Sequence, residues 1–473
     1  MVIRHSLLYF LGRIIPGAIS LLTLSVYTRL LTTDQYGHYS LVIAAAGFIS
    51  AVCFQWLSLS LGRYLPAHAD KPQELLSTAL TGYLMLIFST GVLGCAVAWL
   101  WPDTSLRGLI AIAVVIGWGQ AWFDLNLRIV NTRLSPIRYG VVSSIKAVAA
   151  LGLGAALFYS GMGVVGVLLG LLVSLFVAPS LIRQHWYGVS VHNYSSQMLK
   201  AMLSYGAPLT VTFLMDLILG ISDRFLLGWF INAKAVGAYA AAYDLTQYSL
   251  GMLTGVIHLA AFPLALRALE EKGTAAAQNQ LKQNVLLLLA ISIPATCGLV
   301  ILANNISAAV LGPEFRNGAG HIIAIVALAI FVGGVKSYYF DYSFQLGHKV
   351  AKQVVSVVWA ASANVVLNLG LIPRYGALGA AYSTLVAFVV GLLASWRLGR
   401  KAFILPPVPK EAYKIVLASI GMAVSLLPTL NWHGRAALAG QVLLGTAIYL
   451  MLLFILDAGR CRLKLTTQLH ISR

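Results

Sequence analysis

The sequence predicts an all-α, polytopic membrane protein of about fourteen transmembrane helices, arranged as two pseudo-symmetric six-helix lobes plus two C-terminal helices. Composition is the first of three observations that predict this class. Hydrophobic residues make up 59% of the chain and charged residues 10%, and the mean hydropathy is +0.84. A soluble domain carries about 25% charged residues. The other two observations are the lengths of the apolar runs and the positions of Lys and Arg between them.

The apolar runs are long enough to cross a bilayer, which takes about 20 residues in a helix. They lack the alternation of polar and apolar residues that a β-barrel strand shows, so we expect helices throughout. The predicted spans are Leu7–Leu31, Gly37–Leu61, Leu75–Leu100, Leu106–Leu127, Tyr139–Tyr159, Val164–Ile182, Leu203–Phe230, Val236–Leu264, Val285–Leu302, Ile322–Leu346, Val354–Ile372, Leu378–Trp396, Ile415–Leu430 and Ala436–Leu456.

The 32 Lys and Arg residues predict the orientation. With the N-terminus in the cytoplasm, 22 of them lie in inner loops and tails, 5 in outer loops and 5 within spans. Cytoplasmic loops carry the excess of Lys and Arg, so both termini are expected in the cytoplasm. The net charge of +18 therefore indicates membrane orientation rather than nucleic-acid binding. The first apolar run is too long for a signal-peptide core, and we expect it to be retained as a span.

An internal repeat divides the predicted spans into two sets of six. The Gly-x-x-Gly segments 163–166 and 376–379 both lie between paired spans, and residues 29–39 match residues 224–239 more loosely. Repeats with an even number of spans keep the same orientation in the membrane. The predicted organisation is an N-terminal lobe (1–185), a cytoplasmic inter-lobe loop (186–202), a C-terminal lobe (203–400) and two further helices with a basic cytoplasmic tail (401–473).

Five cationic residues interrupt the predicted spans. A charge at bilayer depth costs about 2.5–3.5 kcal/mol on insertion scales, so such side chains usually face a bundle interior or a wet cavity. Together they indicate a cavity for an anionic substrate. The predicted substrate-binding residues are Arg13, Arg29, Lys146, Arg224 and Lys336.

Each cation that lies near a helix end or an acid has an alternative role. Arg29 lies close to the end of its span and can snorkel to the interface. Arg224 follows Asp223 directly and can form a structural ion pair, while Lys336 can pair with a buried carboxylate. Arg13 can act as an anchor in the inner leaflet. The sequence alone does not decide between these roles and substrate binding.

Three acids are candidates for ion coupling, namely Asp216, Asp244 and Asp223. Asp216 lies near the middle of its predicted span, where a carboxylate can bind a proton or a cation. Its alternative role is to neutralise one of the cavity cations.

Catalytic signatures are absent from the sequence. It contains no GxxxxGK[ST] nucleotide-binding motif. The outer loops are too short for an extracytoplasmic catalytic domain. The four cysteines show no CxxC spacing. We therefore expect a protein that is not an enzyme and that needs no metal or other cofactor.

Three segments resemble the polysaccharide-type flippases of the multidrug/oligosaccharidyl-lipid/polysaccharide exporter superfamily, which move O-antigen-type lipid-linked oligosaccharides. They are Thr28–Leu41 (TRLLTTDQYGHYSL), Val236–Leu245 (VGAYAAAYDL) and Asn364–Phe388 (NVVLNLGLIPRYGALGAAYSTLVAF). The first two resemble the outer turns that open each half of such proteins. The third resembles the hairpin between the eleventh and twelfth spans and is the most specific of the three.

The resemblance implies a transporter of the bacterial inner membrane. It would carry an oligosaccharide linked to undecaprenyl diphosphate to the outer leaflet by alternating access, in the biosynthesis of O-antigen, capsule or exopolysaccharide. A proton or sodium gradient and a glycan polymerase are candidate partners.

Rival functions make different demands on the sequence. A cation-coupled drug antiporter of the same superfamily predicts an acid-lined cavity. A membrane glycan polymerase or ligase predicts a large outer loop. A flippase for peptidoglycan precursors also predicts a cationic cavity.

Overall fold

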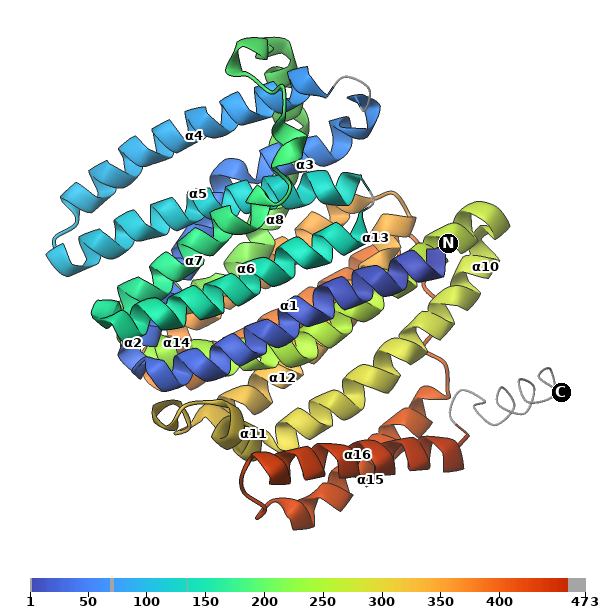
Figure 1. Ribbon diagram of the computed structural model, residues 1–473. Coiled ribbons are helices and arrows are strands. Elements are labelled where there is room, and N and C mark those ends of the chain that lie inside the picture. The colour runs from blue at the N-terminus through green and yellow to red at the C-terminus, as the bar shows by residue number, and fades with distance from the viewer. Residues whose placement is uncertain (1, 69–71, 134, 458–473) are drawn as a thin grey trace. The chain divides into compact units, whose positions relative to one another are not determined.

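The computed structural model describes residues 2–68, 72–133 and 135–457, and every regular element within those ranges is a helix (Figure 1). The all-α class is therefore confirmed. The chain forms two compact units, Met1–Gly237 and Ala238–Arg473. This division falls later than the predicted inter-lobe loop, and the repeat boundaries stay a prediction. The predicted basic tail from residue 458 onward lies outside the described residues.

The first unit holds the first eight helices and the beginning of the ninth. They are α1 (Val2–Leu30), α2 (Thr33–Ile49), α3 (Gln55–Tyr64), α4 (Gln73–Leu100), α5 (Thr104–Thr132), α6 (Pro136–Leu157), α7 (Gly163–Ser180), α8 (Ser196–Phe230) and α9 (Ala233–Thr246). A π-helical turn, Ser50–Phe54, joins α2 to α3. The start of α2 is fixed by a capping box, in which the Thr32 hydroxyl accepts from the Gln35 amide and the Gln35 side chain accepts from the Thr32 amide.

The second unit continues from α9. Its helices are α10 (Met252–Ile301), α11 (Ala303–Val310), α12 (Ala319–Val335), α13 (Tyr342–Leu346), α14 (Val350–Gly399), α15 (Ala412–Leu426) and α16 (Arg435–Ile455). The last two pack against each other, and α15 packs on α10. The amide nitrogen Nδ2 of Asn305 lies 3.1–3.2 Å from the backbone oxygens of Leu430 and Trp432 and from Oε1 of Gln441. Polar side chains thus tie the two additional helices to their own unit.

Nine helices among the described residues are long and apolar enough to cross a membrane, or ten if the bent pair Ser196–Val211 and Phe213–Phe230 counts as one span. Three long helical segments contain a glycine with positive φ: Gly161 (94°), Gly273 (78°) and Gly376 (55°). At 1.5 Å per residue, a 50-residue segment such as α14 would extend about 75 Å. That is more than twice the hydrocarbon thickness of about 30 Å. Each glycine falls where the sequence predicts a turn between two spans, and the total of fourteen stays a prediction.

Small residues let α1 and α6 approach closely. A Cβ atom added to Gly12 would lie 3.2 Å from the Cα of Gly140. The Tyr27 hydroxyl donates to the backbone oxygen of Ala150 at 2.7 Å. Close backbone packing of this kind is typical of helices in membranes, where small residues bring backbones together. The contact holds α1, with Arg29 near its end, against α6.

Gly37 and Gly237 form a reciprocal crossing between the starts of α2 and α9. A Cβ on Gly37 would lie 1.8 Å from the backbone oxygen of Ala233, and a Cβ on Gly237 would lie 1.9 Å from that of Thr33. The sequence had matched these glycines as equivalent positions of two repeats. Backbone atoms are the obstacle at both positions, so a side chain of any size requires the helices to separate.

Gly37→Ala is expected to lower the free energy of unfolding by about 1–3 kcal/mol, the usual cost of overpacking. Gly47→Ala is the matched control on the same helix, because nothing lies within 4 Å of the Cβ added there. That control is expected to be neutral or stabilising by about 0.5–1 kcal/mol. Thermal unfolding of both purified variants measures the difference, and equal midpoints would show that the crossing does not need glycine.

The segment after α7 is docked on α5 rather than extended. The Trp186 ring stacks on Trp122 with centroids 4.9 Å apart, and a guanidinium nitrogen of Arg133 donates to Nδ1 of His185 at 2.8 Å. Burial, followed by the Arg133 charge, lowers the pKa of His185, which favours the neutral imidazole that accepts this hydrogen bond. The predicted inter-lobe loop therefore begins as a packed segment.

Candidate functional site

Four of the five predicted substrate-binding cations lie in the first unit, and Lys336 lies in the second. Arg13 is within α1, but its side chain lies outside the described residues. The remaining four occupy three different kinds of environment.

Arg29 and Arg224 both contact serine hydroxyls. Arg29, near the end of α1, is exposed, and its Nη1 donates to the backbone oxygen and the hydroxyl of Ser25. Arg224, on α8, is half-buried, and its Nη1 donates to the Ser40 hydroxyl of α2 at 2.9 Å. Ser40 belongs to the first of the family-like segments. The Arg224 contact thus joins α8 to the helix that follows the first predicted outer turn.

The predicted ion-coupling acids differ in exposure. Asp216 and Asp223 lie on α8 about two turns apart and on one face. The Asp216 side chain is exposed, whereas Asp223 is 1% exposed. Asp244, on the part of α9 that belongs to the second unit, is half-buried. The first two acids therefore share the helix that carries Arg224.

Lys146 lies beside an aromatic ring and an acid. Its Nζ is 5.5 Å from the centroid of the Phe123 ring, a cation–π distance. The neighbouring Asp124 accepts from the Gln120 amide at 3.0 and 3.1 Å and interacts electrostatically with both Lys146 and Arg128. Sequence spacing could not reveal the interaction between Asp124 and Lys146, because it joins α5 to α6.

Lys336 forms a buried ion pair. Its Nζ lies 2.8 Å from Oδ2 of Asp341, and the two side chains are 5% and 2% exposed. The Ser395 hydroxyl, on α14, donates to the other carboxylate oxygen at 2.6 Å. This is the Lys–carboxylate pair that the sequence left open as the alternative for Lys336. For Lys336 to meet a substrate anion, it must leave Asp341.

A π-helical turn, Lys336–Phe340, makes this pair possible. Residues five apart do not face each other on an α-helix, where neighbours are three or four apart. In the π-turn the Asp341 amide donates to the Lys336 carbonyl at 2.9 Å, which stacks the two side chains. Turns of this type occur frequently at functional sites.

A second polar contact lies next to this pair and connects α10 to α13. The Nδ1 atom of His258 lies 2.7 Å from the Tyr342 hydroxyl. The His258 ring also stacks on Tyr338 with centroids 5.0 Å apart. No sequence signal links His258 to Tyr338 or to Ser395.

The family profile described as "Polysaccharide biosynthesis protein" matches residues 2–269. A putative O-antigen transporter of Shigella flexneri is 22% identical over 422 residues, which cover 84% of this chain and 97% of the relative. A probable low-salt glycan biosynthesis flippase of Haloferax volcanii is 21% identical over 396 residues, covering 82% of this chain and 81% of the relative.

Solved structures share the fold at low identity. The lipid II flippase MurJ in an inward closed conformation superposes with a TM-score of 0.79 at 16% identity, covering 96% of this chain and 99% of that one. An inward-facing multidrug resistance transporter of the MATE family has a TM-score of 0.58 at 14% identity, covering 84% and 94%. An outward-facing MATE structure has a TM-score of 0.56 at 14% identity, covering 84% and 95%.

Proposed function

The chain belongs to the polysaccharide biosynthesis protein family and is a flippase of the multidrug/oligosaccharidyl-lipid/polysaccharide exporter superfamily, and from this premise we propose its substrate and mechanism. It moves an oligosaccharide linked to undecaprenyl diphosphate from the cytoplasmic to the outer leaflet of the bacterial inner membrane. The product feeds the biosynthesis of a surface polysaccharide such as O-antigen, capsule or exopolysaccharide. A glycan polymerase is the expected partner on the outer side.

The observation that carries this proposal is the set of cations within apolar helices. A diphosphate must cross about 30 Å of hydrocarbon, where an unpaired charge is prohibitively costly. The planar fork of Arg binds phosphate in bidentate fashion and stays charged at any relevant pH. Arg29 and Arg224 already donate to serine hydroxyls, which are groups that phosphate oxygens can replace.

The five cations have unequal roles in the proposal. Arg13, Arg29, Lys146 and Arg224 form the cationic path through helices of the first unit. Lys336 joins the path only in a state in which it exchanges Asp341 for the substrate. A drug antiporter would require an acid-lined path instead. The MATE drug transporters resemble this chain only in fold.

Transport proceeds by alternating access, with both termini in the cytoplasm. Support comes from the fold, which is shared with MATE transporters solved in inward-facing and outward-facing conformations. Orientation follows from the 22 Lys and Arg residues assigned to inner loops and tails against 5 in outer loops.

Asp216, Asp223 and Asp244 are the proposed sites for a coupling proton or Na⁺, with Asp216 the first choice because its side chain is exposed. Asp216→Asn is expected to remove the dependence of transport on the ion gradient, since the amide carries no charge to titrate or to attract Na⁺. Asp103→Asn, in an exposed loop, is the control. Transport is measured with and without an imposed proton or Na⁺ gradient. If transport by Asp216→Asn depends on the gradient as strongly as transport by the unaltered protein, Asp216 has only a structural role.

Cells that lack the chain test the proposed function. Lipid-linked oligosaccharide is expected to accumulate on the cytoplasmic leaflet and to return to the outer leaflet when the chain is restored. Normal translocation combined with unpolymerised glycan outside would favour the polymerase or ligase reading. Accumulation of a peptidoglycan precursor instead would assign the chain to that pathway.

A further inference from the structure

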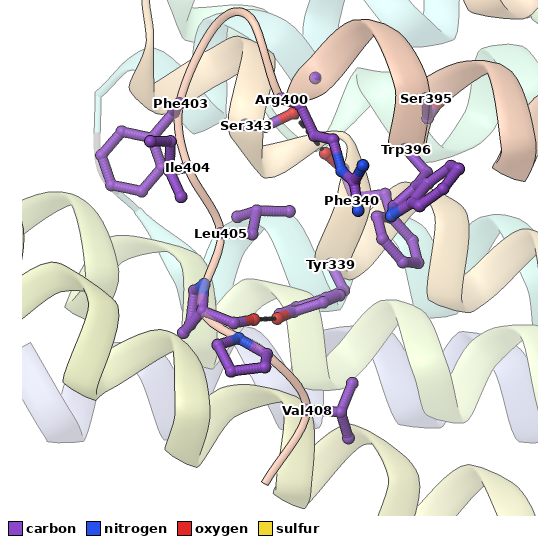
Figure 2. A pocket seen from close by; sticks show the side chains of 13 residues that line it. Tyr339, Phe340, Ser343, Ser395, Trp396, Arg400, Phe403, Ile404, Leu405 and Val408 are labelled. Atoms are coloured by element: carbon purple, nitrogen blue, oxygen red, sulfur yellow. Dashed lines mark hydrogen bonds between the residues drawn. The ribbon is translucent and has the colours of Figure 1, made fainter.

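The second unit contains a cavity of about 430 Å³ beneath the loop that joins α14 to α15 (Figure 2). Its walls include Tyr339 and Phe340 of the π-turn, Trp396 and Arg400 at the end of α14, and Leu405 of the loop. The volume falls within the range of about 300–1,000 Å³ that is typical of small-molecule sites. None of the cavity's lining residues belongs to the predicted substrate-binding set.

The loop over the cavity is held in place. The Tyr339 hydroxyl donates to the backbone oxygen of Pro406, a contact drawn in Figure 2. Pro406, Pro407 and Pro409 restrict the backbone, because the proline ring fixes φ near −65°. The cavity is therefore preformed, and ligand binding would not carry the entropic cost of ordering the loop.

Arg400 supplies the only charge among the residues that line the cavity, all of which are described. Its guanidinium lies 4.0 Å from the centroid of the Trp396 ring, and Figure 2 shows it directed toward Phe340 and the interior of the cavity. The Asp341 carboxylate, which follows the π-turn directly, already interacts with Lys336 and Ser395. Stacking on Trp396 fixes the plane of the guanidinium, whose fork of donors matches the geometry of a phosphate.

The surroundings are basic and the rim is apolar. Basic residues lie near both ends of α14 and in the loop that follows it: Lys349, Lys352, Arg397, Lys401 and Lys410. The Lys349 ammonium donates to the backbone oxygen of Lys401 at 3.0 Å, which brings the start of α14 close to this loop. At the rim, Ile404 is 73% exposed and Trp396 is 40% exposed. Tryptophan is enriched at the membrane–water interface, and basic pockets on the cytoplasmic side of transmembrane helices bind acidic headgroups.

We propose that this cavity binds the phosphate headgroup of an acidic phospholipid from the cytoplasmic leaflet. The Arg400 guanidinium pairs with the phosphodiester, the glycerol region lies against Phe340 and Leu405, and an acyl chain leaves past Ile404 into the bilayer. A single cation matches a phosphodiester, which carries one negative charge. A lipid diphosphate carries more charge than this site neutralises. Binding of this lipid requires that the Gly399 end of α14 lies on the cytoplasmic side of the membrane, and it does not depend on what the protein transports.

Full-length protein purified in a neutral detergent provides the test. Dioleoyl phosphatidylglycerol is expected to raise the midpoint of thermal unfolding and to remain bound in native mass spectrometry, whereas dioleoyl phosphatidylcholine is not. Arg400→Gln is expected to weaken phosphatidylglycerol binding about tenfold, the effect of losing a charge-assisted hydrogen bond. Arg400→Lys keeps the charge but not the fork, and its affinity for phosphatidylglycerol is expected to lie between that of the unaltered protein and that of Arg400→Gln.

Arg397→Gln is the matched control. Arg397 carries the same charge and lies three residues before Arg400, but its side chain does not line the cavity. Equal weakening by Arg397→Gln and Arg400→Gln would show general surface attraction and overturn the proposal. Stabilisation by inorganic phosphate alone would identify a site for a soluble anion. Displacement of phosphatidylglycerol by undecaprenyl diphosphate would assign the cavity to the transported lipid.

Discussion

Lys336→Met is expected to lower the free energy of unfolding by about 3–5 kcal/mol, because it leaves the Asp341 carboxylate buried without its cation. The Asp341 side chain is 2% exposed, so water cannot replace the lost ammonium group. Ser395 would still donate one hydrogen bond, but a neutral hydroxyl does not balance a buried charge. Thermal unfolding of the purified variant and its level in membranes measure the effect.

The double variant Lys336→Met with Asp341→Asn separates stability from transport. It removes both charges and keeps an oxygen that can accept from Ser395, so most of the lost stability is expected to return. Export is expected to stay lost if Lys336 meets the substrate anion during transport. Recovery of both stability and export would show that the pair serves only to hold α14 against the π-turn.

Arg224→Gln is expected to reduce glycan export by about ten- to a hundredfold while the protein stays in the membrane at normal levels. The reason is the loss of one or two charge-assisted hydrogen bonds to the diphosphate, each worth about 1.5–3 kcal/mol. The side chain is half-buried and Gln is smaller and uncharged, so the fold should tolerate the change. Arg224→Lys should retain part of the activity, since it keeps the charge without the fork.

Lys234→Gln is the control for Arg224→Gln, because Lys234 is exposed at the start of α9 and its loss changes the net charge equally. Export is measured as glycan on the outer surface relative to the amount of protein in the membrane. Equal export by both variants would remove Arg224 from the cationic path.

Much of the fold follows from one-dimensional features of the sequence. Apolar runs of about 20 residues require helices in a bilayer, since backbone polar groups must be satisfied within the segment. The breaks at Gly161, Gly273 and Gly376 fall where polar or turn residues interrupt those runs. The number of spans is harder to establish, because helices continue through short turns and merge into segments much longer than one bilayer.

The cations could be identified from the sequence because charge within an apolar run is rare and costly. Their partners could not. Ser40 lies 184 residues from Arg224, and Ser395 lies 54 residues from Asp341. The pairing of Lys336 with Asp341 depends on a π-turn, whereas helical periodicity would place those side chains on different faces. Tertiary contacts and a local departure from α-helical geometry decide these parts of the site.

Reconstitution of the purified protein into vesicles tests the central claim most directly. A fluorescent undecaprenyl diphosphate-linked oligosaccharide is placed in both leaflets, and a membrane-impermeant quencher is added outside. We expect the protein to bring the inner-leaflet pool within reach of the quencher, and Arg224→Gln vesicles to do so far more slowly. A quenched fraction that stays at the outer-leaflet level, as in protein-free vesicles, would contradict the proposal that this chain flips a lipid-linked glycan.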